Sequence, residues 1–312
     1  MSDNSANAGS VHAGQGRAGK AASRSPFRQT ISALLHDRLA LAGLIIVAIF
    51  VIAAIFAPLL APQNPYDLAQ LDILDGRLPP GSHATSGMLY LIGTDDQGRD
   101  LMSAILYGLR TSLLVGISSA AVALVIGASI GLISAYIGGR LDAFLMRIVD
   151  IQLSFPAILI SLIFLAILGQ GVDKIILALI VTQWAYYART IRGSALVERK
   201  RAYVDAARSM ALPDGSILFR HILPNCLPPL IVVATMRVAY AIMLEATLSF
   251  LGIGLPVTQP SLGLLISNGF EYLLSGDYWI SFFPGLALLM LIVGINLIGD
   301  ALRDILNPRR EG

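Results

Sequence analysis

Residues Tyr203–Asn225 read YVDAARSMALPDGSILFRHILPN, a polar stretch between two long apolar ones. Connections between membrane helices are usually short, so a connection of about 35 residues with a helical pattern of its own requires a reason. The pattern predicts a short helix over Tyr203–Met210. Asp205 suits the positive end of that helix, and alanine, which follows it twice, is the best helix former.

A turn and a second short helix are predicted to follow. Pro213, Asp214 and Gly215 are typical turn residues. The second helix, Ser216–Ile222, is expected to stop at Pro224, because the residue before a proline is pushed out of the α region. This helix-turn-helix is either a rigid knob that a partner protein grips or an ordinary loop, and the pattern alone does not separate the two.

An acidic residue and two alanines in this stretch are followed by a small residue and then by Ile-Leu-Pro. The positions are Asp205, Ala206, Ala207, Ala211, Ile222, Leu223 and Pro224. The motif resembles the EAA loop of ABC importer permeases. Asp205 stands where glutamate is usual and Ala211 where glycine is usual, and alanine can replace that glycine only if the backbone does not need a positive φ. Flanking residues also fit the family: Tyr203, Arg208, Arg220, His221 and Asn225.

The resemblance implies a role for this loop. In that family it forms a coupling helix that sits in a cleft of the ATPase subunit. The residues expected to couple to an ATPase are Tyr203, Asp205, Ala206, Ala207, Arg208, Met210, Ala211, Leu212, His221, Leu223 and Pro224. His221 is expected to lie at this contact and not to bind a metal, because no second His or Cys lies at ligand spacing.

The composition places the chain in a membrane. Of its 312 residues 55% are hydrophobic and 13% are charged, with a mean hydropathy of +0.72, whereas soluble domains carry about 25% charged residues. The net charge of +2 is too small to suggest nucleic-acid binding. The single Cys226 excludes an internal disulfide, and no secretory signal peptide is evident.

The chain is not expected to hydrolyse ATP, to hold a cofactor or to contain catalytic residues. Gly14, Gly19 and Lys20 have P-loop spacing, but Ala21 replaces the hydroxyl residue that would hold magnesium, and no strand precedes them. They lie in a segment rich in glycine, alanine and serine, residues 1–26, which is predicted to be a disordered cytoplasmic tail.

Hydropathy predicts an all-α membrane protein with six transmembrane helices, and the resemblance implies the type I ABC importer permease fold. Residues 27–60 hold an amphipathic helix, Phe27–Arg38, and the first span, Leu39–Leu60. Residues 61–110 form an extracytoplasmic segment, and residues 111–303 form the permease core with the coupling loop 190–226. Further spans are expected at 112–137, 151–168, from 175, 227–250 and 282–302, before a cytoplasmic tail at 304–312.

The basic residues set the expected orientation. With the N-terminus inside, about 17 of the 22 Lys and Arg lie on the cytoplasmic side. The positive-inside rule therefore places both termini and the Asp205 loop in the cytoplasm. Small residues spaced along 112–137 predict close helix packing.

The stretch Gly93–Gly116 begins GTDDQGRD. Asp95, Asp96 and Asp100 could be read as calcium ligands. The alternative is that Thr94 or Asp95 caps a helix while Arg99 and Asp100 face solvent.

Two stretches narrow the resemblance. The GTD and GRD motifs, and the run LDAFLMRIVDIQLSFPAIL at 141–159, resemble the dipeptide, oligopeptide and nickel branch of the importers, C-type permeases. That resemblance implies a heterodimer with a related B-type permease, two cytoplasmic ABC ATPases and an extracytoplasmic substrate-binding protein. Close relatives carry dipeptides, oligopeptides, glutathione, opine-like compounds or nickel chelates, so the substrate stays open.

Arg237 and Glu245 lie inside the predicted fifth span, where a charge is costly. They either line the translocation path or are structural, pairing with a neighbour such as Asp150 or Asp300 or contacting a partner subunit; the residues alone favour the structural alternative. Gln183 and Asn296 are expected to form hydrogen bonds between helices.

Two other classes of protein were compared with the permease. An ion-driven secondary transporter would need an inverted repeat or a relay of ionisable groups, which the sequence does not show, and it has no use for the Asp205 loop. An intramembrane protease would need a catalytic motif, and none is present.

Overall fold

The computed structural model describes residues 32–67 and 71–306. The named elements in those ranges are α2 (Arg38–Ile55), α3 (Ala57–Leu60), η2 (Ile73–Asp75), β1 (Ser82–His83), β2 (Leu89–Tyr90), α4 (Leu101–Ile137), α5 (Gly139–Ser154), α6 (Ala157–Leu168), α7 (Val172–Glu198), α8 (Ala202–Ser209), α9 (Asp214–Ser216), η3 (Ile217–Ile222), α10 (Leu223–Phe250), α11 (Leu262–Phe270), η4 (Leu273–Ser275) and α12 (Trp279–Ile305). The predicted tail at 1–26, Phe27 and Ile31 of the amphipathic helix, and residues 307–312 lie outside the described residues.

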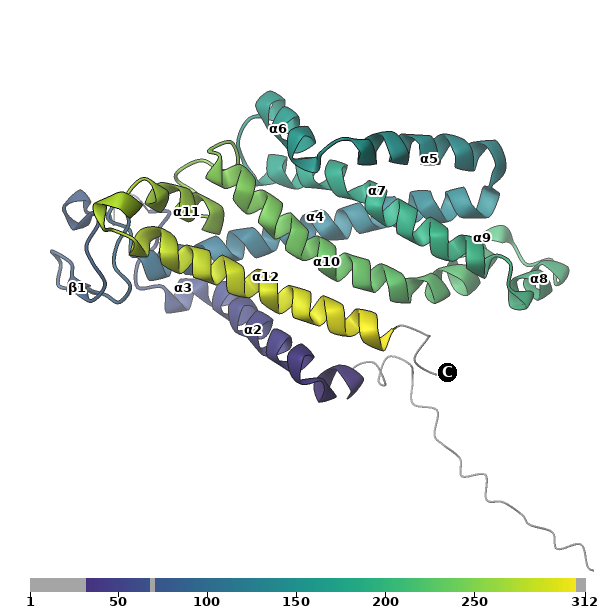
Figure 1. The fold of residues 1–312 in the computed structure, drawn as a ribbon, viewed down its shortest axis with the longest axis horizontal. Coiled ribbons are helices and arrows are strands. Elements are labelled where there is room, and N and C mark those ends of the chain that lie inside the picture. Colours follow the sequence, from purple (N-terminus) through teal and green to yellow (C-terminus); the bar gives the residue numbers. More distant parts are fainter. Residues whose placement is uncertain (1–31, 68–70, 307–312) are drawn as a thin grey trace, which may run out of the picture.

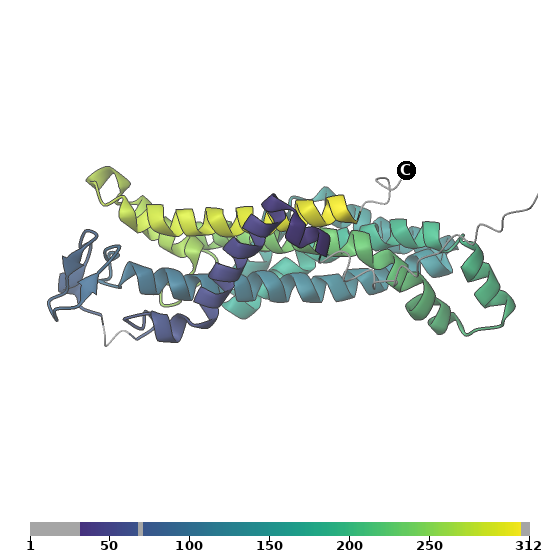
Figure 2. The same ribbon diagram turned by 90° about the horizontal axis from the view of Figure 1, so that it is seen from below.

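The long helices form an elongated bundle. In Figure 1, α4, α7, α10 and α12 run along the long axis, β1 and α11 lie near one end, and α8 and α9 lie at the other. Figure 2 shows that the bundle is thin in the second direction and that α2 crosses it at an angle. The pair α4 and α7 is the most extensive contact between helices, and α2 packs on α12 and α4.

The described helices support four or five membrane spans. Helices α2, α4, α10 with its preceding turns, and α12 are long and apolar enough, and α5 with α6 would make a fifth. The predicted first and sixth spans fall on α2 and α12, and the predicted fourth span falls on α7, which is not one of these candidate spans. The count of six spans stays a prediction.

Helix α4 starts 11 residues before the predicted second span. It has 37 residues. It begins at Leu101 because Asp100 caps it by accepting a hydrogen bond from the Ser103 backbone nitrogen (2.8 Å). At 1.5 Å per residue it is about 55 Å long, well beyond a hydrocarbon core of about 30 Å. It therefore extends past the core and connects the two ends of the molecule.

The close packing predicted from small residues is confirmed between α4 and α7. A Cβ added to Gly127 would lie 2.2 Å from the carbonyl oxygen of Trp184, and one added to Gly131 would lie 2.2 Å from that of Ala188. Both distances are far below van der Waals contact, so only glycine allows this approach.

The predicted third span, 151–168, is wrong as a single straight helix. Its first residues, up to Ser154, belong to α5, and α5 and α6 meet at an angle of 88°. Phe155 precedes Pro156, and both residues have extended backbone (ψ 139° and 127°). A residue before proline avoids the α conformation, so the chain turns sharply here.

The prediction that the second loop helix stops at Pro224 is also wrong. Helix α9, the π-helical turn η3 and α10 follow one another without a gap from Asp214 to Phe250. Pro224 sits in the first turn of α10, where a missing N–H costs little. The wider π-helical turn just before it accommodates the proline, so the fifth span reaches the loop as one continuous element.

We call residues 71–100 the polar cap. Its centre is Asp75, which accepts hydrogen bonds from Thr85 Oγ1 (2.6 Å) and Tyr90 Oη (3.0 Å) and is 5% exposed. Burial raises the pKa of Asp75, but the hydrogen bonds from Thr85 and Tyr90 outweigh it and hold that pKa below its usual value. Asp75 is thus one of the buried carboxylates that organise this irregular segment.

Two predictions about the GTDDQGRD motif are wrong. Arg99 and Asp100 do not face solvent, since they are 1% and 2% exposed, and the residue that caps α4 is Asp100 and not Thr94 or Asp95. Asp95 is 0% exposed, and Arg99 Nε donates to Asp95 Oδ2 (2.6 Å). A buried charge is tolerated when it is paired, which is why the two residues face each other. Arg99 also donates to the carbonyl oxygen of Val257 (3.2 Å), which ties the cap to the chain before α11. Gly98 has φ +74°, and a Cβ there would lie 2.1 Å from the Asp72 carbonyl oxygen.

Candidate coupling site and intramembrane charges

Helix α8 is held against the bundle by one face. Val204 (0% exposed) and Ala207 (4%) enter the apolar cluster formed with Ile217, Ile222 and residues of α4, α7 and α10. On the opposite face, Asp205, Ala206 and Ser209 are exposed, and Met210 just beyond the helix is 73% exposed. We call Asp205, Ala206, Ser209 and Met210 the coupling face. Ala206 and Ala207, which the motif does not distinguish, therefore lie on opposite sides of α8.

A Schellman motif ends α8. The Leu212 N–H donates to the Ala207 carbonyl (3.2 Å), and the Ala211 N–H donates to the Arg208 carbonyl (2.9 Å). Ala211 has φ +54°, which is the conformation that favours glycine. The backbone here does need a positive φ, so alanine occupies the position at a cost in strain of roughly 1–2 kcal/mol.

Tyr203 connects the end of α7 to the start of α10. Its hydroxyl donates to Glu198 Oε2 (2.6 Å) and accepts from Asn225 Nδ2 (3.2 Å). Asn225 also donates to the carbonyl oxygen of His221 (2.7 Å). Burial, followed by the hydrogen bond to Glu198, raises the pKa of Tyr203 to about 12, so it stays neutral at physiological pH.

Arg208 faces the end of α4. Its guanidinium carbon lies 5.8 Å from the centre of the Tyr136 ring, and its Nη1 lies 3.8 Å from Asp205 Oδ1. The Tyr136 hydroxyl donates to Asp214 at the start of α9. The loop thus contacts α4, α7 and α10 at once, and a force applied to α8 would reach all three helices.

The structure separates the residues that the motif predicted together. Tyr203 lies beside His221, and the His221 Nδ1 donates to the Ser216 carbonyl (3.2 Å). Leu212 and Leu223 pack against the core, whereas the coupling face points outward and Pro224 is exposed. Glu198, which the sequence reasoning missed, is a central acceptor. Nothing in the local sequence around Glu198, just before the loop, indicated that role.

The intramembrane Glu245 is engaged inside the chain. It is fully buried, and its two carboxyl oxygens accept hydrogen bonds from Ser112 Oγ of α4 (2.9 Å) and Ser249 Oγ (2.8 Å). Arg237, two turns earlier, instead lies over the rings of Tyr186 and Tyr240. The expected pairing with Asp150 is not found, because Asp150 pairs with Arg189; Asp300 is exposed.

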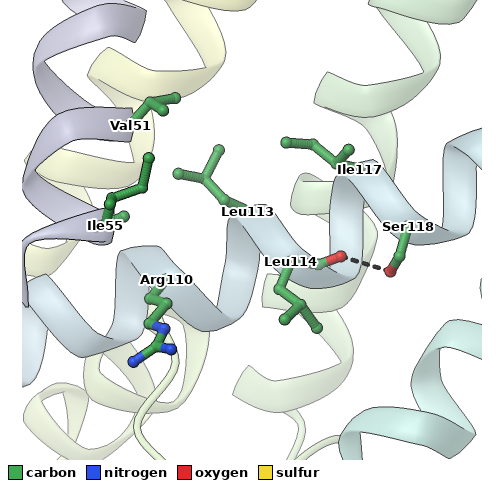
Figure 3. A pocket seen from close by; sticks show the side chains of 8 residues that line it. Val51, Ile55, Arg110, Leu113, Leu114, Ile117 and Ser118 are labelled. Carbon is green, nitrogen blue, oxygen red and sulfur yellow. Dashed lines mark hydrogen bonds between the residues drawn. The ribbon is translucent and has the colours of Figure 1, made fainter.

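Two cavities flank the long helices. One, of about 830 Å³, is lined by residues of α7, α10 and α12, including Thr190, Glu198 and Asn225. The other, of about 490 Å³, lies between α2 and α4 (Figure 3). Apart from Arg110 and Ser118 its walls are apolar, and the Ser118 hydroxyl donates to the Leu114 carbonyl. The first cavity has more polar lining residues: Thr190, Ser194, Glu198, Asn225 and Arg303.

The fold and the loop define a membrane-embedded transport component. A chain of the MetNI methionine ABC transporter, solved in inward-facing conformations, is similar over 66% of this chain and 97% of that one, with a TM-score of 0.54 and 23% identity. The family of binding-protein-dependent transport system inner membrane components matches residues 123–312, and the N-terminal transmembrane domain of oligopeptide transport permease C matches residues 25–80. The chain belongs to this family: it is a multi-pass inner-membrane permease with an ABC importer permease fold.

Two relatives are similar over nearly their full length. The dipeptide transport system permease protein DppC of Alkalihalophilus pseudofirmus is 37% identical over 92% of this chain and 91% of its own. The glutathione transport system permease protein GsiD of Pectobacterium atrosepticum is 34% identical over 92% of each chain. The predicted branch of the family is thereby confirmed.

Proposed function

We propose that this chain is the permease subunit of an ATP-driven importer for peptides or related small solutes, and that α8 receives the motion of a partner ATPase. The observation that carries the proposal is the two-sided α8: Val204 and Ala207 fix it in the core while the coupling face stays exposed. The polar cap lies at the opposite end of the bundle (Figure 1). A helix that is exposed on one side and rigidly attached on the other can transmit a push.

The proposed assembly supplies what this chain lacks. ATP hydrolysis belongs to two cytoplasmic ABC ATPases, a related B-type permease completes a heterodimer, and a substrate-binding protein delivers cargo at the cap. Both termini and α8 face the cytoplasm, as the basic residues predict. ATPase closure would shift the bundle between inward-open and outward-open states, because the ATPases bind the two states with different affinities. The peptide assignment follows the names of the relatives.

The test is uptake by the complex reconstituted with its partners in proteoliposomes. Asp205→Arg and Ala206→Trp change the coupling face without touching the core, so we expect a loss of uptake of at least about tenfold, the size of effect that one or two interface contacts can produce. ATPase recovered with the permease should fall as well. Glu271→Arg, an exposed acid near the opposite end, is the control for ATPase recovery, which it should leave unchanged. Normal uptake and ATPase recovery in both coupling-face variants would refute the proposal.

A further inference from the structure

Arg237 occupies the middle of α10, where a charge is hardest to keep. It lies 14 residues after Leu223 and 13 before Phe250, about 20 Å from each, within the continuous element Asp214–Phe250. A charged side chain at that depth faces the interior of the protein or a water-filled path and is stabilised by a partner there. The question is which partner Arg237 has.

Within the described chain, Arg237 is held by rings and not by a carboxylate. Its guanidinium carbon lies 3.5 Å from the centre of the Tyr186 ring and 5.1 Å from that of Tyr240. The six ion pairs of the described residues involve other arginines. Cation–π contacts hold a guanidinium in place and leave its N–H groups free to donate.

The larger cavity leads toward this arginine. It is lined at the α8 end by Glu198 and Asn225, and deeper by Thr190, Val233 and Met236. On α10, Val233 lies one helical turn before Arg237 on the same face. On α7, Tyr186 lies one helical turn before Thr190 on the same face. The side chain of Arg237 is half-buried and not sealed. The cavity, which has both polar and apolar lining residues and also holds Arg303, thus runs along α7 and α10 to within one helical turn of Arg237.

We propose that Arg237, framed by Tyr186 and Tyr240, binds the carboxylate of the imported solute midway through the membrane. The proposal rests on the proposed function and names the chemical class that the path selects. A guanidinium presents paired donors that match a carboxylate, and every unmodified linear peptide carries one at its C-terminus. Glu245 differs because Ser112 and Ser249 already occupy its carboxyl oxygens. The strongest rival is that a carboxylate of the partner permease pairs with Arg237.

A first experiment measures the charge preference of the cavity without any substrate. In the full complex with Cys226→Ala, Val233→Cys is treated with an anionic and a cationic methanethiosulfonate reagent. At about 6 Å in water, one cation should favour the anionic reagent by about tenfold over the cationic one, and Arg237→Gln should remove that preference. Val197→Cys, near the α8 end of the same cavity, is the matched control, and Arg237→Gln should leave its reagent preference unchanged.

A second experiment measures selectivity. Uptake of alanyl-alanine and of its C-terminal amide is compared, each normalised to the amount loaded on the binding protein. We expect uptake of the carboxylate form to exceed that of the amide by about tenfold, as for a charge-assisted hydrogen bond. Arg237→Gln should abolish this preference, and Arg237→Lys should retain part of it. Stimulation of ATPase activity by the binding protein should persist in both variants.

The outcomes separate the two proposals. Failure of Val233→Cys to react in the assembled complex, or a reagent ratio that Arg237→Gln leaves unchanged, overturns the carboxylate site and points to the partner permease. A wild-type complex without ATPase stimulation refutes the proposed function instead. If Arg237→Gln abolishes uptake altogether, selectivity cannot be measured, and the ratio of anionic to cationic reagent at Val233→Cys decides whether the carboxylate site stands.

Discussion

The polar cap and the α8 end are both charged segments of an apolar chain, but they differ in whether their charged side chains are buried or exposed. In the cap, Asp95 and Arg99 are buried and paired, and Trp279 of α12 donates to the Thr94 carbonyl (3.3 Å). At the other end, Asp205 has a side chain 69% exposed and Met210 is 73% exposed. In the cap the charges of Asp95 and Arg99 pair with each other, whereas the α8 end presents a surface that a partner could complete.

The largest expected effect is in the cap. Asp95→Ala leaves the Arg99 charge buried and unpaired, which should lower the free energy of unfolding by about 3–5 kcal/mol. Thermal unfolding of the purified protein in detergent measures this. Asp205→Ala, an exposed acid at the other end, should change stability by less than about 0.5 kcal/mol. Similar melting temperatures for the two variants would contradict the contrast between the two ends.

The two alanines of α8 give the next test. Ala207→Leu adds volume to the packed cluster with Ile217 and Ile222 and should cost about 1–3 kcal/mol. Ala206→Leu, one residue away on the exposed face, should leave the melting temperature nearly unchanged while reducing uptake. The prediction fails if both substitutions destabilise the protein equally.

Acid should weaken the cap through Asp75. Because its folded pKa is lowered, its contribution to stability is complete above the unfolded value of about 3.9 and is lost as the pH falls through the folded pKa. Asp75→Asn should cost about 1–2 kcal/mol at pH 7, through weakened hydrogen bonds, and should flatten the fall in melting temperature between pH 5 and 3. An unchanged acid profile in this variant would exclude Asp75 as its source.

The smallest expected effect is a gain at the α8 end. Ala211→Gly relieves the strain at φ +54° and should stabilise the protein by about 0.5–1 kcal/mol after the entropy that glycine loses on folding. Ala211→Val should act in the opposite direction. The melting temperatures of the pair, measured side by side, check both signs, and a loss of stability with glycine would contradict the Schellman geometry.

Several features could be predicted from residue patterns because they depend on local chemistry. The helix over Tyr203–Met210 follows from its alanines and matches α8 within a residue at each end. The small residues of 112–137 predicted the close contact that Gly127 and Gly131 make with α7. Both predictions rest on side-chain size and helix propensity, which neighbours in sequence already fix.

Other features escaped prediction because a distant part of the chain decides them. Arg99 is buried where Asp95 accepts from its Nε and the distant Val257 carbonyl accepts from its Nη1. The 88° bend at Pro156 and the uninterrupted helix through Pro224 show the same residue type acting differently in different surroundings.

The sequence by itself determined that this chain spans a membrane and that its charged loop belongs to an importer permease, because apolar length and motif chemistry are local properties. Tertiary structure alone decided that Ala207 is buried and Ala206 is not, that Glu245 is held by Ser112 and Ser249, and that Arg237 faces two tyrosine rings. Burial, pairing and access depend on which helices meet, and that is set by the packing of the whole bundle.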